Sequence, residues 1–144
     1  MFGLDKTWQL DERLKADTFP IMVHAEYQYL LMNDKRWPWV IIVPMIADAE
    51  ELHDLSVARQ QTVMAICGDA AAKLKIFTQC DKINIAAIGN MVRQLHVHVI
   101  GRSEGDANWP GPVWGHGVAE KYTGAEGRAL AEQLKEELRV SLFS

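Results

Sequence analysis

The sequence has few cysteines, no long hydrophobic run and no excess of positive charge, and each absence excludes a class of protein. Its two cysteines, Cys67 and Cys80, are too few for a disulfide framework, and they form neither a C-x-x-C pair nor any zinc-ligand spacing. No stretch approaches the roughly 18 consecutive apolar residues of a membrane span, and residues 1–14 carry charges where a secretory signal would be apolar. We therefore expect a cytoplasmic protein without a membrane-spanning segment.

Charge and composition narrow the choice of function. The 144 residues include 15 lysines and arginines against 19 aspartates and glutamates, which gives a formal net charge of −4. An extended nucleic-acid surface needs clustered positive charge, so this balance argues against one. Hydrophobic residues make up 49% of the chain, and no repeat or linker divides it. We expect one domain over residues 1–144, with its core at about 20–102 and a Trp/Pro-rich loop and a helix in 103–144.

Hydrophobic periodicity predicts an α+β fold. Asp48 and Glu51 have the spacing of a capping box, and apolar residues then recur at three- and four-residue steps to Phe77, which predicts one long helix. Thr123 and Glu126 form a second capping box before a C-terminal helix. The strands are grouped instead of alternating with helices, so we expect a mostly antiparallel sheet. A short helix is expected at 7–14, and about five strands at 21–24, 27–32, 37–44, 82–88 and 94–100.

Two of the five histidines stand two residues apart on the last of these strands. Side chains alternate along a strand, so Gln94, His96 and His98 should share one polar face, opposite a core face. The two imidazoles would lie about 6.6 Å apart along the strand, close enough to bind one phosphate-sized group. Two simpler interpretations remain open at this point. The pair could lie on a solvated strand face, or it could be two metal ligands, although no spacing nominates the third ligand that a metal needs.

Residues 89–102 resemble the signature of the histidine triad (HIT) family, in which His-x-His-x-His is followed by a hydrophobic pair. The resemblance extends over about residues 20–102, including the hydrophobic run 39–44, the helix entry 51–55 and Asn84. Trp109 followed by proline is similar to the Trp-Pro tail of some members. The chain departs from the pattern at its first histidine, which is Gln94, at the usual glutamine and hydroxyl residues (Asn90 and Met91), and at a usual histidine, which is Trp39.

The resemblance implies a HIT-like fold and a nucleotide phosphohydrolase or nucleotidyl transferase. Its substrate would be a phosphoramidate or a dinucleoside polyphosphate, and it would form a covalent nucleotidyl-histidine intermediate. His96 would be the nucleophile, His98 would donate a hydrogen bond to the phosphate or the leaving atom, and Gln94 would orient His96. No metal or other cofactor is implied, and the partners would be a small nucleotide and a second copy in a homodimer. The expected substrate-binding residues are Asn33, Asn84, Gly89 and Asn90, with Asp34 as a further ribose candidate.

Two other functions remain open for this sequence. The departures at Trp39, Met91 and Gln94 are compatible with a nucleotide-binding or signalling module that has weak or no turnover. The second alternative is a metal-dependent hydrolase that uses His96 and His98 as ligands. For Trp109 and Trp114, packing of the loop or burial at an interface is expected more often than stacking on a base.

Overall fold

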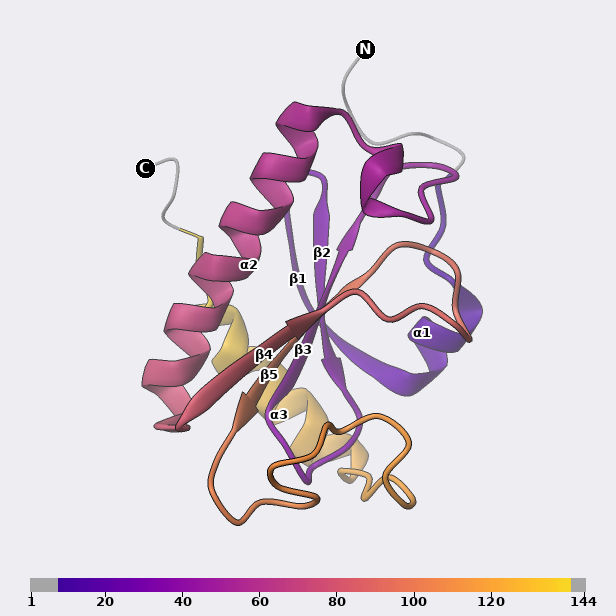
Figure 1. The fold of residues 1–144 in the computed structure, drawn as a ribbon. Helices are drawn as coiled ribbons and strands as arrows, with labels where there is room; N and C mark the ends of the chain where they lie inside the picture. The colour runs from indigo at the N-terminus through magenta and orange to yellow at the C-terminus, as the bar shows by residue number, and fades with distance from the viewer. Residues whose placement is uncertain (1–7, 141–144) are drawn as a thin grey trace.

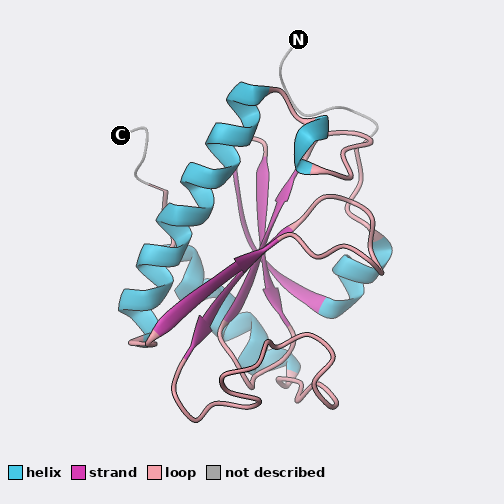
Figure 2. Ribbon diagram, in the orientation of Figure 1, coloured by secondary structure: helices cyan, strands magenta, loops and turns pink. Residues whose placement is uncertain are grey.

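The computed structural model describes residues 8–140 and contains a five-stranded antiparallel sheet (Figures 1 and 2). Every neighbouring pair in the order β1-β2-β3-β5-β4 runs antiparallel. The α+β class and the five antiparallel strands predicted from the sequence are confirmed. The strands are β1 (Thr18–His24), β2 (Tyr27–Met32), β3 (Trp39–Pro44), β4 (Lys82–Ala86) and β5 (Val97–Arg102).

The helices confirm some of the predictions made from neighbouring residues and correct others. They are α1 (Glu12–Asp17), a 3-10 turn η1 (Leu52–Asp54), α2 (Val57–Thr78) and α3 (Gly124–Glu137). The predicted capping box is present before α3, where the Thr123 hydroxyl accepts from the Glu126 N–H at 3.1 Å. The short helix lies at α1 instead of 7–14, and residue 7 lies outside the described residues.

The predicted start of the long helix at Asp48 is wrong. Asp48 has a φ of 62°, in the left-handed region instead of the extended region typical of an N-cap, and the first helical turn after it is η1 at Leu52. The carboxylate of Asp54 accepts hydrogen bonds from the backbone N–H groups of Glu50 and Glu51, which closes the single turn η1. The long helix α2 begins only after Ser56, whose hydroxyl accepts from the N–H of Arg59 at 3.2 Å.

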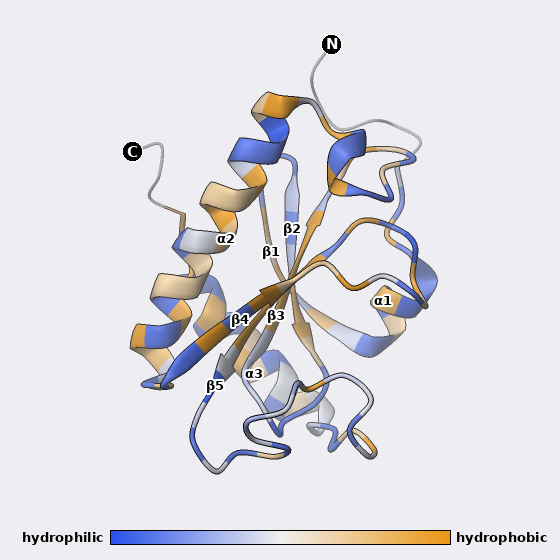
Figure 3. Ribbon diagram, in the orientation of Figure 1, coloured by the Kyte–Doolittle hydropathy of each residue, from blue (hydrophilic) through white to orange (hydrophobic). Residues whose placement is uncertain are grey.

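The sheet is covered on both faces. Helices α2 and α3 pack on one face, in a core that includes Leu74, Val99 and Leu134. A second apolar cluster lies on the other face and includes Leu14 of α1, Ile100 and Val113. Figure 1 shows α2 and α1 on opposite sides of the strands, and Figure 3 shows hydrophobic residues along the sheet between them. Both faces of the strands that carry the site described below are therefore buried.

Because both faces of the sheet are covered, the polar face expected for β5 is not exposed to solvent. Its alternation is as predicted, because Val97 and Val99 face the α2 side whereas Ile100 joins the second cluster. The other face is not open and polar, however, because all six residues of β5 are buried. The strand also begins at Val97 and not at Gln94, so Gln94 precedes the ladder.

None of the helices among residues 8–140 is long and apolar enough to cross a membrane.

Candidate active site

His96 and His98 lie side by side inside the protein. Their ring centroids are 4.9 Å apart with an interplanar angle of 68°, and the two residues are 5% and 4% exposed. The register of the sheet places His98 opposite Ile41 of β3 and Ala86 of β4. The predicted pairing of these two imidazoles is therefore present, but in a buried environment instead of a solvated strand face.

His96 has one nitrogen held and the other open. Its Nδ1 lies 2.7 Å from the carbonyl oxygen of Gln94, and a carbonyl only accepts, so Nδ1 carries the proton. Within residues 8–140 no hydrogen bond reaches Nε2, which carries the lone pair in this tautomer. The ring of His96 is therefore fixed through Nδ1, and its other nitrogen has no hydrogen-bond partner within residues 8–140.

Two cavities meet at His96. One, of about 320 Å³, is polar and is lined by the residues Glu50, Gly89, Asn90, Arg93 and others. The other, of about 330 Å³, is more apolar and is lined by the residues Trp39, Met91, His98, Trp114 and others. Asn90 and His96 border both cavities. His96 thus borders both a polar space and a more apolar one.

Gly89 lets the backbone approach this ring. A Cβ atom built there would lie 2.6 Å from the carbonyl oxygen of Val92 and 3.6 Å from Cε1 of His96. The first distance is shorter than real carbon contacts, so a side chain cannot be placed without moving the 89–92 turn. The predicted substrate-binding residues Gly89 and Asn90 are therefore both beside His96.

His98 is held at both nitrogens. The indole Nε1 of Trp39 donates to Nδ1 at 2.9 Å, and Nε2 lies 3.3 Å from the carbonyl oxygen of Ile88. Burial, followed by repulsion from His96, lowers the pKa of His98 to about 4, although the Ile88 carbonyl acts in the opposite direction. His98 is consequently neutral at pH 7, with its proton on Nε2.

Aromatic rings enclose His98. The ring of Trp114 lies 5.2 Å from that of His98 and 6.2 Å from that of Trp39, both nearly perpendicular to it. Trp109, by contrast, lies against the guanidinium of Arg102 at 5.7 Å. In this chain Trp114 therefore packs at the site, whereas Trp109 packs within its own loop.

The side chain of Gln94 points away from the histidines. Its Oε1 accepts from the backbone N–H of Asp11 at 2.9 Å, and its Nε2 donates to the carbonyl of Gln9 at 2.8 Å. The contact to His96 comes from the main-chain carbonyl of Gln94. Gln94 precedes the strand, and this leaves its amide free to hold the segment before α1.

The expected substrate residues Asn33 and Asn84 lie in contacts of their own. The side-chain oxygen of Asn33 accepts from the N–H of Tyr122 at 2.9 Å, and that of Asn84 accepts from Arg102 at 3.4 Å. Neither residue lines the two cavities at His96. Asp34, the further ribose candidate, pairs with Arg36 at 2.7 Å. The structure thus brings together His96, His98, Gly89 and Asn90, but not these three residues.

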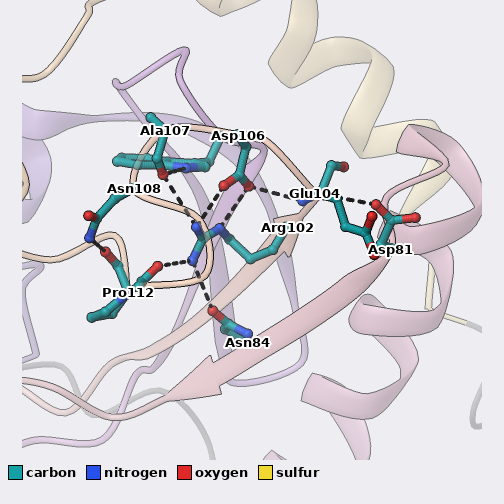
Figure 4. A network of polar contacts seen from close by, with 11 residues as sticks. Asp81, Asn84, Arg102, Glu104, Asp106, Ala107, Asn108 and Pro112 are labelled. Carbon is teal, nitrogen blue, oxygen red and sulfur yellow. Dashed lines mark hydrogen bonds and ion pairs between the residues drawn. The ribbon is translucent and has the colours of Figure 1, made fainter.

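Alternation along the strand predicts Arg102 on the side of the histidines, with a solvated arginine as the alternative, and the structure shows it buried at the end of β5. It is 1% exposed and forms two bonds of 2.7 and 2.8 Å to Asp106 (Figure 4). Its Nη1 donates to the carbonyl of Gly111 and the side chain of Asn84, and its Nη2 also donates to the carbonyl of Ala107. These bonds anchor the loop that carries Trp114 to the end of β5. The sequence signal was its parity with His98 and an aspartate four residues later.

A metal site has no further support among residues 8–140. No group of three or more histidine, cysteine, aspartate or glutamate side chains is placed to hold an ion in that part of the chain. The remaining histidines are spread over the fold, with His24 half-buried and His53 and His116 exposed.

Comparisons with known proteins agree with the fold. The family model of the HIT domain matches residues 13–105. A histidine triad protein from Sinorhizobium meliloti is 50% identical, with a TM-score of 0.88 over 94% of this chain and 99% of that one. One from Bradyrhizobium japonicum is 40% identical, with a TM-score of 0.86 over 91% and 98%. One from Marinobacter aquaeolei is 41% identical, with a TM-score of 0.84 over 92% and 93%.

A search among curated proteins found no match. The family match covers more than half of the chain and includes the histidine pair, and the similar crystal structures extend over almost its whole length. The chain belongs to the histidine triad (HIT) family.

Proposed function

We propose that this protein is a nucleotide phosphohydrolase or nucleotidyl transferase in which His96 forms a covalent nucleotidyl intermediate. The substrate would be a dinucleoside polyphosphate or a nucleoside phosphoramidate. The observation that supports the proposal is the state of His96, whose Nδ1 lies 2.7 Å from the Gln94 carbonyl oxygen, whose Nε2 has no hydrogen bond within residues 8–140, and which lines two cavities. A fixed, neutral imidazole is the form that attacks phosphorus.

The reaction proceeds in two displacements. In the first, the Nε2 lone pair of His96 forms a bond to the α-phosphorus, and the bond from phosphorus to the bridging atom breaks with its electron pair on the leaving group. In the second, water attacks the same phosphorus and loses a proton to the solvent, the N–P electrons return to Nε2, and the nucleoside monophosphate is released. Dividing one difficult displacement into two easier steps is the gain of covalent catalysis.

Neighbouring groups supply hydrogen bonds to the phosphate. The Nε2–H of His98 lies 3.3 Å from the carbonyl of Ile88, a long bond that a phosphate oxygen could replace. Asn90 borders both cavities, and its side-chain amide is a second donor. Donors already oriented in a buried site stabilise the charge that develops on the phosphorus oxygens. Gln94 would contribute through its carbonyl, which keeps the His96 ring in place.

Hydrolysis assays test the proposal. Purified protein is given diadenosine tetraphosphate or an adenosine phosphoramidate in the presence of chelator, and AMP release is measured. The wild type is expected to release AMP, and His96→Ala is expected to lose that activity. His53→Ala is the matched control, because His53 is exposed and lies on η1. Equal activity in the wild type and His96→Ala would overturn the assignment of the nucleophile.

A nucleotide-binding module with weak turnover is the second candidate. It is favoured by one observation, that both nitrogens of His98 are already bonded within the protein. Calorimetry distinguishes the two candidates. Micromolar binding of AMP together with turnover no higher than that of His96→Ala would identify a binding module. The family resemblance also leads us to propose a homodimer, which sedimentation velocity would detect.

A further inference from the structure

The hydrogen bond between Trp39 and His98 fixes where the proton of His98 lies. An indole N–H can only donate, and it lies 2.9 Å from Nδ1 of His98, so Nδ1 must present a lone pair. The proton of the neutral ring is then on Nε2, which faces the carbonyl oxygen of Ile88 at 3.3 Å. One tautomer satisfies both contacts, and protonating Nδ1 would break the bond to Trp39.

Apart from the Ile88 carbonyl, which favours a positive charge on His98, the surroundings of the ring oppose one. The nearest titratable group is His96, with ring centroids 4.9 Å apart. Trp114 covers another side of the ring at 5.2 Å. Arg13 and Asp17 of α1 line the same cavity, and they form an exposed pair with each other at 3.9 Å. Among the described residues no carboxylate bonds to His98, in accordance with the lowering of its pKa by burial.

We propose that Trp39 is a positioning residue that holds His98 as the neutral Nε2–H tautomer, so that the site favours leaving groups that depart as stable anions, such as the phosphate end of a phosphoanhydride. This proposal rests on the proposed function and narrows its substrate class. The site would prefer nucleoside polyphosphates to phosphoramidates of alkyl amines, and this preference would depend on the bond between Trp39 and His98.

The proton balance explains the preference. When Nε2 of His96 attacks a phosphoanhydride, the Pα–O bond breaks and the electron pair stays on a phosphate oxygen, which is stable without a proton near neutral pH. An alkyl amine must receive a proton as the Pα–N bond breaks. A neutral His98 can donate a hydrogen bond from Nε2 but is a poor source of that proton. The rate with the amine therefore depends on protonation from water.

Nuclear magnetic resonance of the ring nitrogens tests the tautomer without any substrate. In the wild type, Nδ1 of His98 is expected to be unprotonated, with a titration midpoint far below the usual histidine range. Trp39→Phe keeps an aromatic ring but lacks the N–H, so its His98 is expected to titrate at higher pH. Trp37→Phe is the matched control, because the Trp37 indole donates to the carbonyl of Ala107 instead. A protonated Nδ1, or an ordinary midpoint in the wild type, would overturn the proposal.

Kinetics test the consequence for substrates. The ratio of kcat/KM for diadenosine tetraphosphate to that for an alkyl phosphoramidate of AMP is measured at pH 6 in the same three proteins. Trp39→Phe is expected to lower this ratio by about tenfold or more, because a protonated His98 can then assist the amine. The Trp37→Phe ratio should equal that of the wild type. An unchanged ratio in Trp39→Phe contradicts the leaving-group preference.

The results of the two experiments distinguish a failure of the proposed function from a failure of the role of Trp39. If neither substrate is turned over, the proposed function and the leaving-group preference are both wrong, whereas the tautomer is still decided by resonance. If turnover is normal and His98 has an ordinary midpoint, only the role of Trp39 is wrong. Circular dichroism of Trp39→Phe confirms that the variant is folded, and Trp39→Leu, which also lacks the N–H, provides a second substitution at the same position if it is not.

Discussion

The rings of His96 and His98 lie 4.9 Å apart, yet their hydrogen bonds give them opposite capacities. His96 is held at Nδ1 alone and keeps Nε2 open, whereas His98 is bonded at both nitrogens. One ring is therefore suited to attack and the other to donate a hydrogen bond. The predictions below follow from the groups that maintain this difference.

Adding a methyl group at Gly89 should damage the site. A Cβ there would meet the Val92 carbonyl at 2.6 Å, so Gly89→Ala must move the turn that contacts His96. We expect the unfolding free energy to fall by about 1–3 kcal/mol, with a loss of kcat/KM. Gly68→Ala in α2 is the control, because nothing lies within 4 Å of its Cβ, and it should stabilise by about 0.5–1 kcal/mol. Urea unfolding and AMP release measure both variants, and full activity in Gly89→Ala would contradict the geometry.

Removing the guanidinium of Arg102 should release the loop over the site. Arg102→Met leaves the carboxylate of Asp106 without its two short bonds, and the expected cost is about 3–5 kcal/mol. Arg102→Lys should recover only part of it, because lysine cannot bind a carboxylate through two parallel bonds. Denaturation with tryptophan fluorescence measures the change. Arg139→Met removes an exposed pair with Glu136 and should give no resolvable change. Equal stabilities of the Arg102 and Arg139 variants would contradict the anchoring role.

The low pKa of His98 should make the protein less stable in acid. Its value falls from 6.5 to about 4 on folding, so the unfolded chain binds more protons between these values. The contribution is fully present above pH 6.5 and is lost as the pH falls toward 4, by up to about 3 kcal/mol. The slope of the unfolding free energy between pH 4 and 6.5 should thus be shallower in His98→Asn than in the wild type. His53→Asn should retain the wild-type slope, and matching slopes in the His98 variant and the wild type would be inconsistent with a neutral His98.

Substituting Gln94 by alanine should distinguish the contribution of its side chain from that of its main-chain carbonyl. Gln94→Ala loses the bonds to the backbone of Gln9 and Asp11, at about 1 kcal/mol each. The carbonyl that holds His96 remains, so kcat should change by less than about tenfold. Hydrogen exchange should show faster exchange at the Asp11 amide. A loss of activity as large as that of His96→Ala would show that the amide side chain takes part in the chemistry.

The sequence predicts those features that depend on neighbouring residues. The capping box of Thr123 and Glu126 is a local arrangement, and the alternation along β5 follows from the geometry of any strand. The start of α2 could not be predicted in this way. The φ of 62° at Asp48 belongs to a turn whose next residue, Ala49, accepts a hydrogen bond from the distant Leu95.

The electrostatics of the site depend on contacts between distant residues. The bond from Trp39 to His98 needs the pairing of β3 with β5, which joins residues 59 apart in the sequence. The burial of His98 needs the loop that Arg102 anchors. The sequence therefore predicts which two histidines lie together. It does not predict which of them keeps a ring nitrogen without a hydrogen bond and which is bonded at both nitrogens.

The central claim, that Nε2 of His96 takes the nucleotidyl group, is tested most directly by the intact mass of the protein during turnover. Reactions with diadenosine tetraphosphate are quenched in alkaline denaturant, because a phosphorus–imidazole bond is labile in acid. We expect the wild type to carry the added mass of one adenylyl group, located on His96 by peptide mapping, and His96→Ala to carry none. Turnover without such an adduct, or an adduct on another residue, would contradict the claim.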